Sequence, residues 1–325
     1  MKLTNNKIIK PVILIFILSA VILAAVCLGA QNISPKILLE SLSAEDGIYH
    51  ALIYNIRIPR IAVALLVGAW LSVGGAVFQS LFKNPLADPY MLGVSSGAAL
   101  GASIAVSLEL AYGFVMLCAA GGAFVSIFMV YLLSSKIEFG SAGLILSGIA
   151  LAFIFSSGVM LVNVFANTQN VHKAMMWLMG DLSLSRFEII LPCLVAGFGI
   201  MIFIWLKAAM LDVIALGDEF SAGLGVVNRD KRIMFIFASI LVAMSVAIAG
   251  VIAFVGLIVP HICRQIFGVR HVRLIPYSAL CGSVFLIFAD TIGRSAMPPY
   301  EIPCGIITSF AGGIFFLVLL LGLRR

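Results

Sequence analysis

Two arginines, Arg57 and Arg60, stand at the start of a long apolar stretch and are the first candidates for recognition chemistry. A guanidinium can bind a carboxylate through two parallel hydrogen bonds, so paired arginines at a helix end could dock an acidic partner. Arginine at a helix end can also reach lipid headgroups, and the residues alone leave both interpretations open. The stretch continues through GGAVFQ (74–79) to NPLADP (84–89) and GVSSGAALG (93–101). A segment that only anchored a protein in lipid would need none of these breaks.

The composition places these residues in a membrane protein. Of 325 residues, 62% are hydrophobic and 10% are charged, and the mean hydropathy is +1.18; soluble proteins carry about 25% charged residues. The apolar runs must be helices because backbone polar groups in hydrocarbon have to be paired within the segment. We therefore expect an all-α polytopic fold forming a single domain over 1–325. Ten crossings are expected near 9–30, 60–82, 91–108, 112–134, 141–166, 188–206, 232–250, 251–267, 274–293 and 303–321.

The first apolar run raises the question of a signal peptide. Three lysines precede it, as in such a leader, but its length of about 20 residues exceeds the 7–15 residues of the apolar region of a signal peptide. We therefore expect a first membrane helix.

Small residues recur every four positions from Gly93 through Gly97 to Gly101. This spacing predicts a smooth face for close helix packing in the third crossing.

Charge placement predicts the topology. With ten crossings and a cytoplasmic N-terminus, 14 Lys and Arg residues lie inside and six lie outside, as the positive-inside rule expects. The six outside are Lys36, Arg57, Arg60, Lys173, Arg186 and Arg294. The count of Lys and Arg residues on each side depends on whether the uncharged stretch from Ile233 to Cys263 crosses the membrane once or twice. If it crosses once, the count becomes ten against ten, so we expect two short helices hinged at Gly250 and both termini in the cytoplasm.

One inner segment is larger than the others and covers about 208–231. Asp218 and Glu219 suit the start of a short helix, and glycines divide the segment into pieces. Leu216, Phe220 and Leu224 recur at helical spacing and form an apolar stripe. The stripe could pack on its own bundle or dock on a partner, since exposed apolar faces often mark interaction sites.

The sequence gives little indication of a catalytic, metal or cofactor site. The chain has no GxxxxGK[ST] phosphate loop, so we expect no ATP hydrolysis by this chain, and no Ser/His/Asp set can be assembled by spacing. Six scattered cysteines lie mostly within apolar runs and indicate small packing residues, not metal ligands. Three methionines near Trp177 could suggest a soft-metal or haem site, but interfacial packing explains them as well. We expect no cofactor and no nucleic-acid partner.

Nine segments in order over nearly the whole chain resemble the FecCD-type family, the permease subunits of ABC importers for iron–siderophores, haem and cobalamin. They are RIPR (57–60), GGAVFQSLFKNPLADP (74–89), LGVSSGAALG (92–101), LSGIAL (146–151), WLMGD (177–181), ALGDEFSAGLGV (215–226), GVIAFVGLIVPHI (250–262), ADTIGR (289–294) and EIPCGIIT (301–308). The resemblance implies the type II ABC importer permease fold and a homodimer of permease copies. It also implies an ABC ATPase dimer on the cytoplasmic face and a substrate-binding protein outside, in a bacterial inner (plasma) membrane.

The resemblance also implies roles for particular residues. The arginines that dock the binding protein correspond to Arg57, Arg60 and Arg294. The segment that couples to the ATPase corresponds to Leu216, Gly217, Asp218, Glu219, Phe220, Ser221, Ala222, Gly223, Leu224 and Gly225. The gate lies near Gly140 and Ser141. Ser156 and Asn163, seven residues apart, share a helix face and could line the pathway or hydrogen bond to another helix.

The sequence therefore predicts the permease subunit of an ATP-driven importer of an iron chelate, with haem or cobalamin as alternative cargo. The rival class is a secondary transporter driven by an ion gradient. Such a protein would be expected to carry carboxylates within its helices. Asp290, Glu188 and Glu109 fall near helix ends, and no carboxylate at mid-membrane is evident. A membrane enzyme or a passive channel would leave the cytoplasmic segment unexplained.

Overall fold

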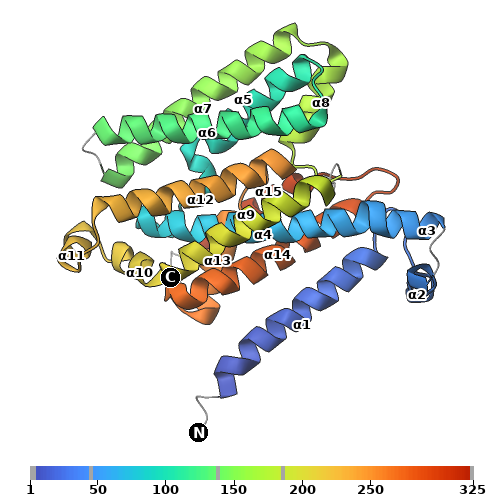
Figure 1. Cartoon of the computed structure of the whole chain (residues 1–325), viewed down its shortest axis with the longest axis horizontal. Coiled ribbons are helices and arrows are strands. Elements are labelled where there is room, and N and C mark those ends of the chain that lie inside the picture. The colour runs from blue at the N-terminus through green and yellow to red at the C-terminus, as the bar shows by residue number, and fades with distance from the viewer. Residues whose placement is uncertain (1–4, 44–46, 137–139, 184–186, 323–325) are drawn as a thin grey trace.

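The computed structural model describes residues 5–43, 47–136, 140–183 and 187–322, and all its regular elements are helices (Figure 1). In chain order they are α1 (Asn5–Cys27), α2 (Pro35–Ser43), α3 (Ile48–Ala51), the π-helix η1 (Leu52–Arg57), α4 (Ile58–Leu81), the 3-10 helix η2 (Pro89–Leu92), α5 (Val94–Ser107), α6 (Tyr112–Lys136), α7 (Gly140–Phe165), α8 (Thr168–Leu178), α9 (Phe187–Leu206), α10 (Ala208–Ala215), α11 (Asp218–Gly223), α12 (Asn228–Ala249), α13 (Val255–Phe267), α14 (His271–Ser295) and α15 (Cys304–Gly322). The all-α polytopic prediction is confirmed.

The helices differ in how much of a bilayer they can span. Among the described residues, seven are long and apolar enough to cross, and α9 with α10 forms a further pair bent by 58°. Helices α5 and α13 have only 14 and 13 residues, or about 20 Å at 1.5 Å per residue, less than the roughly 30 Å hydrocarbon core. Each expected apolar segment coincides with a helix, but ten full crossings stay a prediction.

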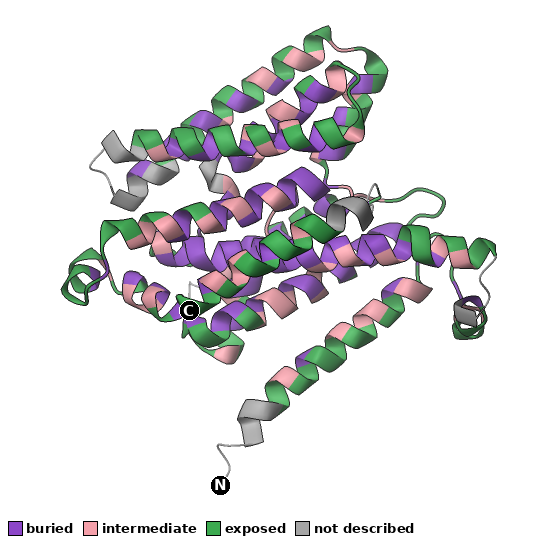
Figure 2. Ribbon diagram, in the orientation of Figure 1, coloured by how far each residue is buried: buried purple, intermediate pink, exposed green. Residues whose placement is uncertain are grey.

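Helix α4 lies at the centre of the bundle. It packs against α12, α13 and α14 along its length, and its Trp70 and Phe78 are fully buried. Figure 2 shows this contrast, with buried residues along α4 and exposed ones on the outward faces of α1, α6 and α7. A helix that is apolar all round is expected to be buried in this way, because every face meets another helix.

Glycines allow the neighbouring helices to approach the backbone of α4. A Cβ on Gly68 would overlap the backbone of Gly282 in α14, and one on Gly75 would overlap the backbone of Gly256 in α13. The predicted small face of α5 is confirmed in the same way, since a Cβ on Gly97 or Gly101 would overlap the backbone of α6. Small residues therefore set the interhelical distances.

The uncharged stretch after Ile233 divides as expected. Helix α12 ends at Ala249, and Gly250 adopts a φ of +70° with no room for a Cβ against the Trp177 carbonyl oxygen. The N-terminal end of α13 lies against η2, where the hydroxyl oxygen of Tyr90 accepts a 3.1 Å hydrogen bond from the Ile252 N–H. The predicted division at Gly250 is confirmed, but only α13 is short, because α12 has 22 residues and is long enough to cross a membrane.

Replacing Gly75 by alanine tests the close packing of α4. Gly75→Ala should lower the free energy of unfolding by about 1–3 kcal/mol, because the added methyl group has no room beside α13. Thermal unfolding in detergent measures the change. Gly121→Ala in α6 is the matched control, because nothing lies within 4 Å of its added Cβ. Equal unfolding temperatures for the two variants would contradict the packing assigned to Gly75.

Candidate functional site

The outer end of α4 carries a cluster of five charged residues, named here the outer cluster: Arg57, Arg60, Asp290, Arg294 and Glu301. Arg60 Nε donates to Asp290 Oδ1 at 2.9 Å, and its Nη1 donates to Glu301 Oε2 at 2.6 Å. Arg294 Nε donates to the second Asp290 oxygen at 2.9 Å. Asp290 is 2% exposed. A buried carboxylate between two guanidiniums ties α4 and α14 together.

The outer cluster also holds the end of α1. Arg294 Nη2 donates to the Ala25 carbonyl oxygen at 3.2 Å, and Arg57 donates to the carbonyl oxygens of Val26 and Gln31. Arg57 forms no ion pair among the described residues. Three arginines face two carboxylates, so the outer cluster carries one excess positive charge, at Arg57.

The structure brings together the three arginines that the sequence placed at the outer face, and buries them. Arg57, Arg60 and Arg294 are 3%, 4% and 4% exposed, which excludes free snorkelling to lipid headgroups in this arrangement. Their docking role is not tested and stays a prediction. The sequence reasoning missed the carboxylate partners. Asp290 stands four residues before Arg294, a spacing that pairs opposite charges on one helix face.

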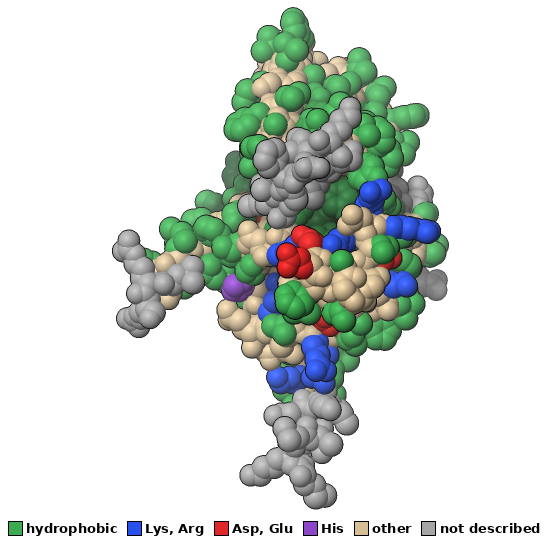
Figure 3. Space-filling model, turned by 90° about the vertical axis from the view of Figure 1, so that its left-hand side faces the viewer, with side chains coloured by type: hydrophobic (Ala, Val, Ile, Leu, Met, Phe, Trp, Pro, Cys, Tyr) green, Lys and Arg blue, Asp and Glu red, His purple; other side chains and the backbone are tan. Residues whose placement is uncertain are grey.

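The opposite end of the bundle presents α10 and α11. Leu216, Phe220 and Leu224 are 63%, 67% and 64% exposed, so the apolar stripe does not pack on its own bundle. Gly217 and Gly225 bound α11 with φ angles of +117° and +83°, a conformation that favours glycine. Figure 3 looks at this end and shows hydrophobic and acidic side chains together, with basic side chains around them.

Asp218 fixes the orientation of α11. Lys231 Nζ donates to Asp218 Oδ1 at 2.8 Å, and Lys83 pairs with the other oxygen. These hydrogen bonds lower the pKa of Asp218 below its ordinary value. The group stays ionised at neutral pH, and its contribution to the fold is lost only as the pH falls through that lowered pKa. Glu219 is exposed beside it, so the two acidic residues differ in role.

A Ser/His/Asp set does exist, although spacing in the sequence gave no sign of it. His271 Nε2 lies 2.5 Å from Ser80 Oγ, and His271 Nδ1 lies 2.6 Å from Asp212 Oδ1. Ser80 and His271 are each 3% exposed, and the serine hydroxyl donates to the Ala76 carbonyl oxygen. A hydrolase needs its serine open to a substrate, so this set is not a catalytic site.

The predicted pathway residues lie on α7. The side chain of Ser141 is outside the described residues. Ser156 is exposed and Asn163 is half-buried. Asn163 Oδ1 is buried without a hydrogen-bond partner in the described part of the chain. Pathway lining and hydrogen bonding to another helix both stay predictions for these residues.

A carboxylate at mid-helix depth corrects the expectation that none exists. Pro89 lies beside Gly256, which also contacts the Leu71 carbonyl oxygen in the middle of α4. The preceding residue, Asp88, is 8% exposed and accepts a 2.8 Å hydrogen bond from the Tyr90 N–H. It therefore caps η2. The NPLADP break re-enters the bundle, which the sequence could not show.

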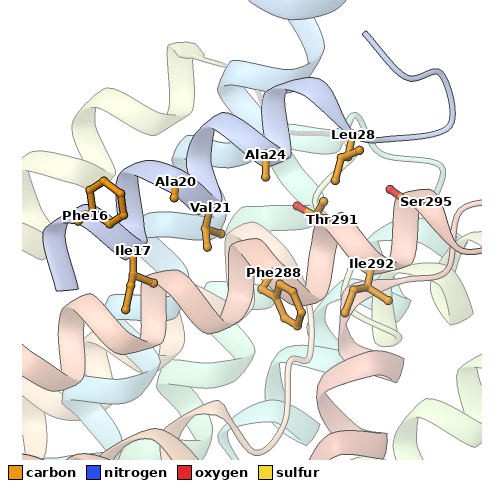
Figure 4. Close-up of a pocket in the computed structure, with 10 residues that line it drawn as sticks. All are labelled: Phe16, Ile17, Ala20, Val21, Ala24, Leu28, Phe288, Thr291, Ile292 and Ser295. Atoms are coloured by element: carbon orange, nitrogen blue, oxygen red, sulfur yellow. The ribbon is translucent and has the colours of Figure 1, made fainter. Parts of the chain in front are cut away.

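Among the described residues, the surface of the bundle includes an apolar groove and a more polar one. One, of about 380 Å³, separates α1 from α14 and is lined mainly by apolar side chains such as Phe16 and Phe288 (Figure 4). That lining suits lipid hydrocarbon better than a charged solute. The other, of about 470 Å³, lies at the outer end between α8 and the α5–α6 turn, and its lining includes Glu109, Lys173 and Trp177.

Removing the buried carboxylate should destabilise the protein strongly. Asp290→Asn leaves two buried guanidiniums without their shared partner and should lower the free energy of unfolding by about 3–5 kcal/mol. Glu301→Gln is the comparison. The Glu301 side chain is 41% exposed, so this substitution should lower the free energy of unfolding much less. Denaturant unfolding in detergent measures both. Equal losses of unfolding free energy in Asp290→Asn and Glu301→Gln would show that Asp290 does not hold the outer cluster together.

Comparison with known proteins agrees with this architecture. The model of the FecCD transport family matches residues 16–322. The chain is 35% identical over 98% of both chains to the Fe(3+)-citrate import system permease protein YfmE of Bacillus subtilis. It is 34% identical to the hemin transport system permease protein HmuU of Yersinia pestis, covering 99% and 98% of the two chains. A solved structure of a metal-chelate type ABC transporter in an inward-facing conformation superposes with a TM-score of 0.85 at 30% identity, covering 96% of this chain and 99% of that one. The chain is a multi-pass membrane protein that belongs to the FecCD transport family.

Proposed function

We propose that this chain is the transmembrane permease subunit of an ABC importer that carries an iron chelate across the bacterial inner (plasma) membrane. The observation that carries the proposal is the exposed apolar stripe on α10 and α11, because exposed apolar faces of this kind mark interaction sites. The similarity to import-system permeases along the whole chain supports it. No catalysis and no cofactor are proposed for this chain.

A separate ATPase dimer is proposed to bind the stripe. Leu216, Phe220 and Leu224 would enter a cleft of the ATPase, and Asp218, held by two lysines, would fix the angle of α11. The stripe lies at the end where the positive-inside rule places the cytoplasm.

A substrate-binding protein is proposed to dock at the outer end. The excess positive charge at Arg57 supports attraction of an acidic surface, with Arg60 and Arg294 contributing to the same field. Since all three are buried, the attraction acts on approach and on the rate of association more than through surface ion pairs.

A second copy of the chain is proposed to complete the pathway along α7. Ser156 is exposed on a helix whose neighbours Phe153 and Ile154 are exposed apolar residues, and polar groups in membrane helices usually face a partner or a pathway. Ser141 would lie at the gate and Asn163 further along. Ten crossings with both termini inside complete this arrangement.

An iron chelate is the proposed cargo, because relatives named for Fe(3+)-citrate and iron(3+)-hydroxamate import match nearly the whole chain. The relatives named for hemin and cobalamin define the competing cargoes. Uptake into vesicles that contain the permease, its ATPase and its binding protein tests the proposal. ATP-dependent uptake of a ferric chelate is expected. Uptake of haem or cobalamin alone would overturn the cargo, and uptake driven by an ion gradient without the ATPase would overturn the class.

Changing the stripe should weaken ATPase binding without unfolding the permease. Leu216→Ser, Phe220→Ser and Leu224→Ser combined should lower the affinity for the ATPase about tenfold or more, because apolar contacts in a desolvated cleft carry most of the binding energy. Pull-down with the purified ATPase measures the affinity. Val227→Ser, also exposed but outside the stripe, is the control. An unchanged affinity of the triple variant would contradict the proposed docking.

Replacing Arg57 should slow the association of the binding protein with the permease. Arg57→Gln should lower the association rate about tenfold at low salt, because electrostatic steering acts mainly on that rate. The effect should shrink at high salt as the charges are screened. Surface plasmon resonance measures both rates. Lys36→Gln, an exposed lysine in α2, is the control, and equal effects of the two changes would count against a specific role for Arg57.

A further inference from the structure

Three residues from separate helices meet near the inner end of α4 and are named here the inner link: Ser80, Asp212 and His271. Ser80 lies in the last turn of α4, Asp212 in α10, and His271 at the start of α14. Asp212 Oδ1 accepts from both the backbone N–H of His271, at 2.9 Å, and from Nδ1, at 2.6 Å. The imidazole therefore holds α10 on one side and α4 on the other.

Hydrogen bonds on both sides of the ring hold the imidazole in place. The Ser80 hydroxyl lies 3.0 Å from the Ala76 carbonyl oxygen and 2.5 Å from His271 Nε2. On the other side, the Asp212 carboxylate accepts from Nδ1. A hydrogen bond to a carboxylate is stronger than one between neutral groups.

The inner link is adjacent to the surface that faces the cytoplasm. Asp212 precedes the exposed stripe by four residues, and its neighbours Leu211 and Ile214 are buried. A second connection reinforces the first, since Asp218 pairs with Lys83, two residues beyond the end of α4. Movement of α10 or α11 must therefore move the inner end of α4 or break one of these bonds.

Helices α4 and α14 continue the connection across the bundle. Near the middle, Ser283 Oγ donates to the Leu65 carbonyl oxygen at 2.7 Å, and Gly68 and Gly282 bring the backbones together. At the far end Arg60 pairs with Asp290. The two helices are thus joined at the inner end, in the middle and at the outer end, and they behave as one body.

We propose that Ser80, Asp212 and His271 are positioning residues that transmit motion of α10 and α11 to the α4–α14 pair, and through it to the outer cluster. This inference rests on the proposed function, because the motion is supplied by ATP binding and hydrolysis in the partner. Without the inner link the ATPase still binds the stripe and hydrolyses ATP, but less of its motion reaches the pathway and the outer end.

The test measures ATP hydrolysis and cargo uptake separately in vesicles that hold the complete transporter. Asp212→Asn keeps the shape of the side chain and removes its charge. It should leave ATPase binding unchanged and lower the cargo moved per ATP about fivefold or more. Asp230→Asn is the matched control, a carboxylate in the same cytoplasmic segment that caps α12 through the Val227 N–H. It should behave as the unmodified protein.

A milder variant keeps the test decisive if Asp212→Asn does not assemble. Ser80→Ala removes one buried hydroxyl and should lower cargo per ATP in the same direction by a smaller factor. The nitrogen chemical shifts of His271 should differ between the unmodified protein and Asp212→Asn, because the variant lacks the carboxylate that accepts from Nδ1.

An unchanged ratio of cargo to ATP in the variants that assemble would overturn the proposal. Failure of the unmodified transporter to take up cargo with ATP would instead count against the proposed function, so the two failures are distinguishable.

Discussion

The close contact between α4 and α14 is the interaction on which the rest of the structure depends. Gly68 and Gly282 allow the two backbones to meet, and Asp290 between Arg60 and Arg294 fixes their register at the outer end. Charges in so buried a place need an opposite charge or hydrogen-bond acceptors, and removing one member of a buried ion pair is strongly destabilising. Helices α12 and α13 then pack on the remaining faces of α4, so the central helix positions both functional ends.

The two ends of the bundle differ in chemistry, as the proposed docking of a different partner at each end requires. The inner end exposes leucine and phenylalanine side chains on short helices bounded by left-handed glycines, which suits a rigid apolar contact. The outer end buries its arginines and leaves one positive charge in excess, which suits attraction over a distance. A transporter driven from one face and loaded at the other needs both surfaces and a rigid connection between them.

The helical breaks show why irregular backbone occurs inside this membrane protein. The NPLADP segment and the turn after Gly250 meet beside the middle of α4, where Asp88 and Tyr90 satisfy backbone N–H groups. Non-helical backbone at such depth survives only when protein groups pair with it. The shortness of α5 and α13 follows from this arrangement, since both begin near the middle of the bundle.

The sequence by itself determined the helical class, the small face of α5 and the apolar stripe around Phe220, because each depends on local composition or on spacing within one segment. The charge count over the whole chain led to the division at Gly250 and brought Arg57, Arg60 and Arg294 to one end. Only the tertiary structure decided that these arginines are buried around Asp290, that Asp88 lies at the depth of Leu71, and that Ser80, Asp212 and His271 meet. Those contacts join residues far apart in the chain, and their partners follow from how the helices pack and not from any periodicity along a single helix.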